Sequence, residues 1–198
     1  MPIPKRAQPS SSHKPRKDIL KVLSSKPVYN GKVFQVTSDK VQEPSGITAQ
    51  RDIVRHSGSV VVLAVDDSGD EPRVLLERQY RYAARDYLWE LPAGRIDPGE
   101  QALTAAKREL REETGYRARQ WKRALFFYSS PGFLDETMAI YLARGLRAGE
   151  AQPEADEAIE CGLLSLSKAL AMVLAGEIRD AKTIAGVLWL AQSKLKTR

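Results

Sequence analysis

Residues 94–116 read Gly94-Arg-Ile-Asp-Pro-Gly-Glu100, then seven further residues, then Arg108-Glu-Leu-Arg-Glu-Glu-Thr-Gly-Tyr116. The apolar side chains of Leu103, Ala106 and Leu110 recur at the spacing of successive helical turns, so they predict a helix over residues 100–114. Gly115 is a typical residue to end such a helix. The stretch therefore predicts a loop over residues 92–99 followed by a helix with one apolar side.

On that helix three glutamate side chains lie along one edge. Glu109 and Glu113 are four residues apart, and Glu112 is three residues from Glu109, so their carboxylates are neighbours. Like charges at this spacing destabilise a helix, and Glu112 and Glu113 also lie near its negative C-terminal end. The arrangement is typical either of a solvated acidic face or of a site that binds a cation.

A cation bound to these carboxylates is predicted to be magnesium. Carboxylate oxygens are hard ligands, and Mg²⁺ commonly shares them with the phosphates of a substrate. Mn²⁺ is the possible substitute. The only histidines are His13 and His56 and the only thiol is that of Cys161, so no cluster of nitrogen and sulfur ligands indicates zinc.

The quoted stretch resembles the Nudix box, which is glycine, five residues, glutamate, seven residues, and then Arg-Glu-aliphatic-any-Glu-Glu-any-Gly-aliphatic. Tyr116 is the one loose match, in the final apolar position. At average residue frequencies, such a match arises by chance in roughly one chain in a million. The resemblance to the Nudix family extends from about Ser57 to Leu190.

This resemblance implies an α+β fold, an α/β/α sandwich with a mixed sheet, in which the box forms loop, helix and loop. The rest of the sequence favours a mixture of strands and helices without regular alternation. From the apolar patterns we expect strands at 33–37, 50–54, 59–65, 73–78, 125–128 and 137–142, and helices that begin near 167 and 180.

Three parts are expected along the chain: a disordered basic tail at 1–17, a small N-terminal antiparallel β-sheet at 18–56, and the Nudix domain at 57–198. The tail holds five cations and no acid, so it supplies most of the net charge of +6. A nearly neutral body argues against a nucleic-acid partner. No run of 18 apolar residues predicts a membrane span, and a single cysteine favours a reducing compartment, the cytoplasm.

The family resemblance also implies roles for the box residues. It implies that the metal ligands are the Ala93 carbonyl, Glu109, Glu112 and Glu113. Arg108 would orient the glutamates by ion pairing and, with Glu112, take part in catalysis. Glu100 would support the helix or a further metal. A plain surface ion pair is the alternative for Arg108 and Glu100.

Two features outside the box resemble the ADP-ribose pyrophosphatase branch of the family. Pro131 stands fifteen residues after Tyr116, and the loop that follows carries Glu136, which matches a glutamate that serves in that branch as base or additional metal ligand. Asp135 is the alternative to Glu136, and a plain Pro-Gly turn is the alternative for the loop. The substrate-binding residues implied by the branch are Arg51, Arg81, Glu90 and Pro131. Arginine suits phosphate recognition, and a surface charge at a strand edge is the alternative for Arg51.

The branch implies a magnesium-dependent hydrolysis of the pyrophosphate bond of ADP-ribose, which yields AMP and ribose 5-phosphate. It also implies a homodimer that exchanges its N-terminal sheets, with Tyr29 and Phe34 as candidates to stack on the base from the partner subunit. Hydrolysis of another nucleoside diphosphate sugar, such as GDP-mannose, is the first alternative. The second is a non-catalytic sensor that binds ADP-ribose, but sensors of that type typically lose the box glutamates that this chain keeps.

Overall fold

The computed structural model describes residues 20–152 and 159–195 of the 198-residue chain. The expected basic tail at 1–17 lies outside the described residues. The described chain forms two compact units, the first made of residues 20–58, 97–99 and 128–137, and the second made of 59–96, 100–127, 138–152 and 159–195.

The first unit contains a three-stranded antiparallel sheet, in the order β1 (Lys21–Asn30), β2 (Gln35–Gln42) and β3 (Thr48–Arg55). Along β2, the alternate residues Thr37, Asp39 and Val41 are buried. This period of two places them on one face of the sheet. All ten residues of β1 are exposed, so this strand leaves a row of side chains open to solvent.

The loop over residues 129–136 belongs to the first unit because it is hydrogen-bonded to the end of β3. The Val54 amide donates to the Phe133 carbonyl at 2.8 Å, and the Asp135 amide donates to the Val54 carbonyl at 3.0 Å. The sequence predicts this loop within the domain at 57–198, whereas its contacts assign it to the first unit. The loop joins the N-terminal sheet through contacts between residues far apart in the chain.

The second unit is built on a seven-stranded mixed sheet in the order β10-β5-β4-β9-β8, with β6 paired to β5 and β7 paired to β4. Its strands are β4 (Ser59–Asp66), β5 (Arg73–Arg81), β6 (Asp86–Glu90), β7 (Ala93–Arg95), β8 (Arg117–Tyr128), β9 (Thr137–Arg147) and β10 (Ile159–Ser165). Strand β4 runs antiparallel to β5 and parallel to β9, which makes the sheet mixed.

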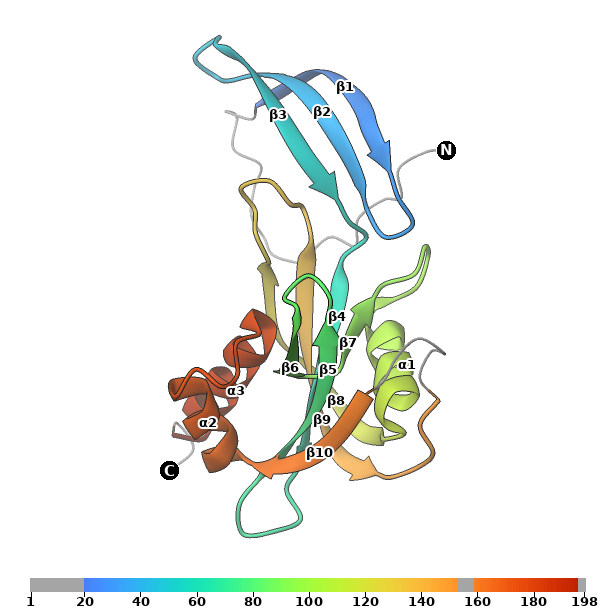
Figure 1. Cartoon of the computed structure of the whole chain (residues 1–198), viewed down its shortest axis with the longest axis vertical. Coiled ribbons are helices and arrows are strands. Elements are labelled where there is room, and N and C mark those ends of the chain that lie inside the picture. Colours follow the sequence, from blue (N-terminus) through green and yellow to red (C-terminus); the bar gives the residue numbers. More distant parts are fainter. Residues whose placement is uncertain (1–19, 153–158, 196–198) are drawn as a thin grey trace. The chain divides into compact units, whose positions relative to one another are not determined.

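Helices cover both faces of this sheet, with α1 (Ala102–Thr114) on one side and α2 (Leu166–Leu174) and α3 (Ala181–Leu195) on the other (Figure 1). The β4 side chains alternate between the two resulting cores: Val61, Leu63 and Val65 pack with α2 and α3, whereas Val60, Val62 and Ala64 pack with α1. A strand buried on both faces reads as a continuous apolar run. The expected α+β fold, an α/β/α sandwich with a mixed sheet and a small antiparallel sheet, is confirmed.

Several elements differ from the sequence-based expectation. Strands β1, β6, β7 and β10 are not among the predicted strands, and β8 begins at Arg117 rather than at residue 125. Much of β8 is exposed and carries Arg, Lys and Gln, so its first half lacks the apolar alternation that marks a half-buried strand. Within residues 20–152 and 159–195, the structure contains no helix long and apolar enough to cross a membrane.

Candidate active site

Helix α1 presents the box glutamates because its opposite side is held in the core. Ala105, Ala106 and Leu110 are fully buried against the sheet. The helix ends at Gly115, whose left-handed φ of 74° suits glycine and lets its amide donate to the Arg111 carbonyl at 2.9 Å. The polar edge of α1 is therefore directed away from this buried side of the helix, as the sequence spacing predicts.

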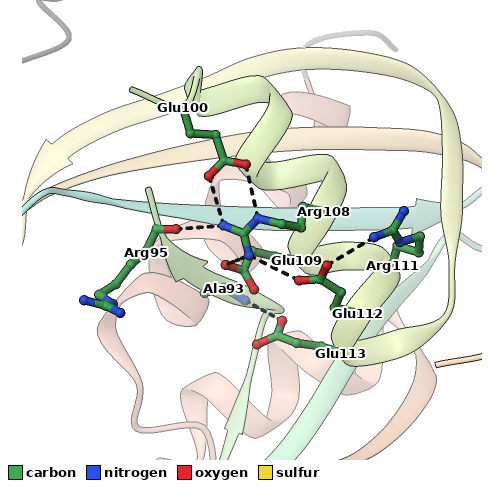
Figure 2. A network of polar contacts seen from close by, with 8 residues as sticks. All are labelled: Ala93, Arg95, Glu100, Arg108, Glu109, Arg111, Glu112 and Glu113. Atoms are coloured by element: carbon green, nitrogen blue, oxygen red, sulfur yellow. Dashed lines mark hydrogen bonds and ion pairs between the residues drawn. The ribbon is translucent and has the colours of Figure 1, made fainter. Parts of the chain in front are cut away.

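Arg108 is the centre of the polar network on this edge (Figure 2). Its guanidinium donates to both oxygens of Glu100, at 3.1 and 3.0 Å, and to Glu109 Oε1 at 2.7 Å and Glu112 Oε2 at 3.2 Å. A further bond goes to the Arg95 carbonyl at 3.1 Å. The hydrogen bonds that Arg108 donates to Glu100, followed by the charge of Glu109, raise the pKa of Arg108. One permanent cation therefore gathers three carboxylates.

Glu113 faces a different partner, the backbone of β7. Its side chain is buried, and its Oε2 atom accepts a hydrogen bond from the Ala93 amide at 3.0 Å (Figure 2). Ala93 was expected in a loop, but it lies in the short strand β7 and pairs with Val61 of β4. The sheet therefore positions the backbone that contacts the box helix.

Gly94 allows β7 and α1 to approach each other. A Cβ atom at this position would overlap with the carboxylate of Glu109. Glycine at this position thus leaves room for the Glu109 carboxylate where it now lies, and a larger residue would make that carboxylate or the strand shift.

The donor set on this edge fits a hard divalent cation. All the side-chain ligands are carboxylate oxygens, which is the ligand type that such cations prefer. In the part of the chain that the structure describes, no three acidic, histidine or cysteine side chains already converge into a complete cation cage. Glu109 and Glu112 instead face Arg108, and Glu113 faces the Ala93 amide. Cation binding would therefore require these carboxylates to rotate from their present partners.

A second polar cluster surrounds Glu90, which is only 1% exposed at the end of β6. Arg81 binds it with two hydrogen bonds, from Nε to Oε1 at 2.7 Å and from Nη2 to Oε2 at 2.9 Å. Lys182, itself buried, forms an ion pair with Glu90 and a second one with Asp180 at 3.1 Å. Burial alone would raise the pKa of Glu90, but the bonds and charges of Arg81 and Lys182 outweigh it, so the pKa is lowered.

Thr183 connects the start of α3 to the segment that precedes the box. Its hydroxyl accepts a hydrogen bond from the Leu91 amide at 2.8 Å and donates to Asp180 Oδ2 at 2.5 Å. The Thr183 amide also donates to Asp180 Oδ2, at 3.0 Å. Asp180, Lys182 and Thr183 are not among the site residues that the sequence predicts. An aspartate just before a helix is a recognisable cap signal, but no local signal marks Lys182 as buried.

The remaining predicted site residues lie in the first unit. Glu136 Oε2 accepts a hydrogen bond from the Ser129 hydroxyl at 2.9 Å, and Glu136 Oε1 lies 3.6 Å from His56 Nδ1. Pro131 lies in the turn between Ser129 and Glu136. The side chain of Arg51 is 47% exposed and pairs with Glu43 at 3.1 Å.

The fold and the glutamate-bearing helix define an α/β/α protein with a box of the Nudix type. The model of the NUDIX domain matches residues 55–186, and the chain belongs to the Nudix family.

Relatives in this family cover most of the chain. An ADP-ribose pyrophosphatase of Mycobacterium tuberculosis (strain ATCC 25618 / H37Rv) is 40% identical over 169 residues, which are 84% of this chain and 80% of the relative. An ADP-ribose pyrophosphatase of Bacillus subtilis (strain 168) is 37% identical over 172 residues, or 86% and 91% of the two chains. A GDP-mannose pyrophosphatase of Citrobacter koseri is 32% identical over 161 residues, or 73% and 82%.

The fold is also that of a solved structure described as an ADP compounds hydrolase. The two chains superpose with a TM-score of 0.77 at 20% identity, over 93% of this chain and 98% of the other. At this identity the likeness concerns the fold alone.

Proposed function

We propose that this protein hydrolyses the pyrophosphate bond of ADP-ribose to AMP and ribose 5-phosphate, with Mg²⁺ as its metal and Mn²⁺ as a substitute. The observation that carries the proposal is the α1 edge, where Arg108 gathers Glu109 and Glu112 while Glu109 lies against Gly94. Two relatives named ADP-ribose pyrophosphatase support the choice of substrate. A single cysteine supports the cytoplasm as the compartment.

The proposed metal ligands combine side-chain and backbone oxygens. They are the Ala93 carbonyl, Glu109, Glu112, Glu113 and Glu136. When bound, a divalent cation neutralises the diphosphate and lowers the pKa of a bound water. In this proposal Arg108 and Glu100 hold the box carboxylates close together when no cation is bound. Glu112 is both a metal ligand and the box glutamate that takes part in catalysis.

The reaction itself requires one proton acceptor near the attacking water. We assign this role to Glu136, which takes a proton as the water oxygen forms a bond to phosphorus and the bond from phosphorus to the bridging oxygen breaks. The two bonds from Ser129 restrict the orientation of Glu136, because its side chain and its carbonyl both accept from that residue. Pro131 shapes the same loop.

We propose that an arginine side chain, that of Arg81, binds the phosphate groups of the substrate. Glu90 fixes the guanidinium plane of Arg81 by two hydrogen bonds, while the Arg81 side chain keeps 38% of its surface exposed. A guanidinium oriented in advance binds phosphate at a lower cost in conformational entropy. Glu90 therefore acts by holding Arg81, and Arg51 is the second candidate for a contact with the substrate.

A homodimer is proposed on the basis of the exposed strand β1. Its apolar side chains Val22, Leu23, Val28 and Tyr29 are each between 43% and 56% exposed. Exposed apolar side chains in one strand mark an interaction surface. Tyr29 also packs against Phe34, with ring centroids 5.5 Å apart. We expect two copies to exchange their N-terminal sheets, so Val28→Glu should convert the dimer to a monomer in light scattering.

The function is tested with purified protein, Mg²⁺ and four substrates: ADP-ribose, GDP-mannose, ADP-glucose and a diadenosine polyphosphate. We expect kcat/KM for ADP-ribose to exceed the others by about tenfold or more. Glu113→Gln and Glu136→Gln should lose most of this activity, whereas Lys107→Ala, an exposed change on the same helix, should not. Product chromatography identifies AMP and ribose 5-phosphate.

Two other outcomes would replace the proposal. Faster hydrolysis of GDP-mannose would assign the enzyme to the activity named for its Citrobacter koseri relative and leave the metal chemistry intact. Binding of ADP-ribose in calorimetry without hydrolysis of any substrate would identify a sensor.

A further inference from the structure

Arg55, at the end of β3, joins three side chains of the first unit through its guanidinium. Nε donates to the Thr37 hydroxyl at 3.0 Å, Nη2 pairs with Asp39, and Nη1 pairs with Asp135 Oδ2 at 3.3 Å. Thr37 and Asp39 are buried residues of β2, and Asp135 lies in the loop after β8. One arginine thus ties the sheet to a loop that lies 80 residues further along the chain.

The residues on both sides of Arg55 bind the same loop. The backbone of Val54 accepts from the Asp135 amide and donates to the Phe133 carbonyl, and Val54 forms a parallel bridge with Leu134. The His56 amide donates to Asp135 Oδ1 at 2.8 Å. Three consecutive residues, Val54 and Arg55 at the end of β3 and His56 directly after it, therefore anchor the loop, and Arg55 provides the charged contact.

Glu136 follows directly after the anchored Asp135. Its carboxylate contacts the Ser129 hydroxyl at 2.9 Å and lies 3.6 Å from His56 Nδ1, an atom that also accepts from the Gly58 amide at 3.1 Å. Because Asp135 is fixed through its backbone and both of its oxygens, the direction in which the next side chain leaves the loop is restricted.

We propose that Arg55 is a positioning residue that acts through Asp135 on Glu136, so that the N-terminal sheet orients the loop carboxylate. The inference rests on the proposed function, in which Glu136 takes a proton during ADP-ribose hydrolysis. Arginine is suited to this role because its planar group donates in several fixed directions at once. A lysine would preserve the charge but reach fewer of the three partners.

The test measures kcat and KM for ADP-ribose in three single variants, Arg55→Gln, Arg55→Lys and Asp135→Asn. It also measures them in the double variant that combines Arg55→Gln with Glu136→Gln. We expect Arg55→Gln to lower kcat by about 10- to 100-fold, as changes to residues that orient a ligand-bearing group do. KM should change by less than about twofold, because substrate contacts remain. Arg55→Lys should recover part of kcat, and Arg73→Gln, which breaks the surface pair with Asp66, is the matched control.

The double variant separates positioning from general damage. If Arg55 acts through Glu136, Arg55→Gln should slow Glu136→Gln by less than about twofold, because the group to be positioned is already lost. A full multiplicative loss in the double variant would overturn the proposal, as would a wild-type kcat in Arg55→Gln. Loss in Asp135→Asn equal to that in Glu136→Gln would also overturn it, since Asp135 would then act directly.

Hydrogen exchange provides a readout that needs no activity. The amides of residues 133–135 should exchange faster in Arg55→Gln than in the wild type, whereas those of β4 should not change. Unchanged exchange would refute the anchor. A wild-type protein that hydrolyses nothing would refute the proposed function instead, while exchange still decides whether Arg55 anchors the loop. If Arg55→Gln does not fold, Asp135→Asn carries the test because it keeps the pair between Arg55 and Asp39.

Discussion

Gly94 of β7 lies so close to Glu109 of α1 that a Cβ atom at residue 94 would overlap with the Glu109 carboxylate. In Gly94→Ala, either the carboxylate or the strand must move. We expect kcat/KM to fall by about 10- to 100-fold, because the displaced group belongs to the proposed metal site. Steady-state kinetics at saturating Mg²⁺ measures this loss.

Gly69→Ala is the control for that experiment. Its nearest neighbour would be the Glu71 carbonyl at 3.8 Å, which is ordinary contact. Wild-type activity in Gly94→Ala would show that the close approach of strand and helix has no functional consequence.

Arg108 should stabilise the metal-free protein by offsetting the repulsion among the carboxylates that it gathers. Arg108→Gln leaves Glu100, Glu109 and Glu112 without their shared cation, so the free energy of unfolding should fall by about 1.5–3 kcal/mol. Added salt should reduce this difference, because the side chain of Arg108 is 27% exposed and its charge is screened. Urea unfolding with EDTA at low and high salt measures both effects.

The control is Lys107→Gln, which removes a neighbouring exposed charge from the same helix. It should alter the free energy of unfolding by less than about 0.5 kcal/mol. An equal loss in the two variants would mean that total charge matters rather than the contacts of Arg108.

Thr183 should contribute to stability through its hydroxyl. Thr183→Val preserves the volume but leaves the buried Leu91 amide without its acceptor. An unsatisfied buried donor costs about 1–3 kcal/mol, so the midpoint of urea unfolding should fall accordingly. Thr104→Val, on the exposed face of α1, should cause a much smaller change. A similar loss of stability in Thr183→Val and Thr104→Val would mean that the low helix propensity of valine, not the lost hydrogen bond, causes it.

Stability should decrease in acid partly through Glu90. Its pKa in the folded protein lies below the ordinary value of 4.5, because Arg81 and Lys182 outweigh burial. The unfolded chain therefore binds the proton more readily, and the stabilisation is present above about pH 4.5 and lost as pH falls through the folded pKa. The difference in unfolding free energy between the wild type and Glu90→Gln should shrink toward low pH.

Glu160→Gln is the matched control, since the Glu160 side chain is 79% exposed and lies 3.9 Å from Arg78. Its effect on the free energy of unfolding should be small at every pH. If the difference in unfolding free energy between the wild type and Glu90→Gln stayed constant from neutral to acidic pH, the lowered pKa of Glu90 would be contradicted.

The sequence by itself determined the elements whose signal is local. The box helix and its end at Gly115 follow from apolar spacing over a few turns, and both match the structure within one or two residues. The buried strand β4 follows from its unbroken apolar run. The spacing of Glu109, Glu112 and Glu113 likewise places them on one edge, because helix geometry alone decides which residues are neighbours.

Only the tertiary structure decided the partners that come from distant parts of the chain. Glu90 meets Lys182, 92 residues away, and Arg55 meets Asp135, 80 residues away. No local pattern marks these pairs, since each depends on where the sheet brings its strands and loops. The strands β1 and β10 were missed for a related reason, because edge and exposed strands are held by pairing with a neighbour rather than by an apolar face of their own. Local geometry is encoded in spacing, whereas a buried charge acquires its partner only when the chain has folded.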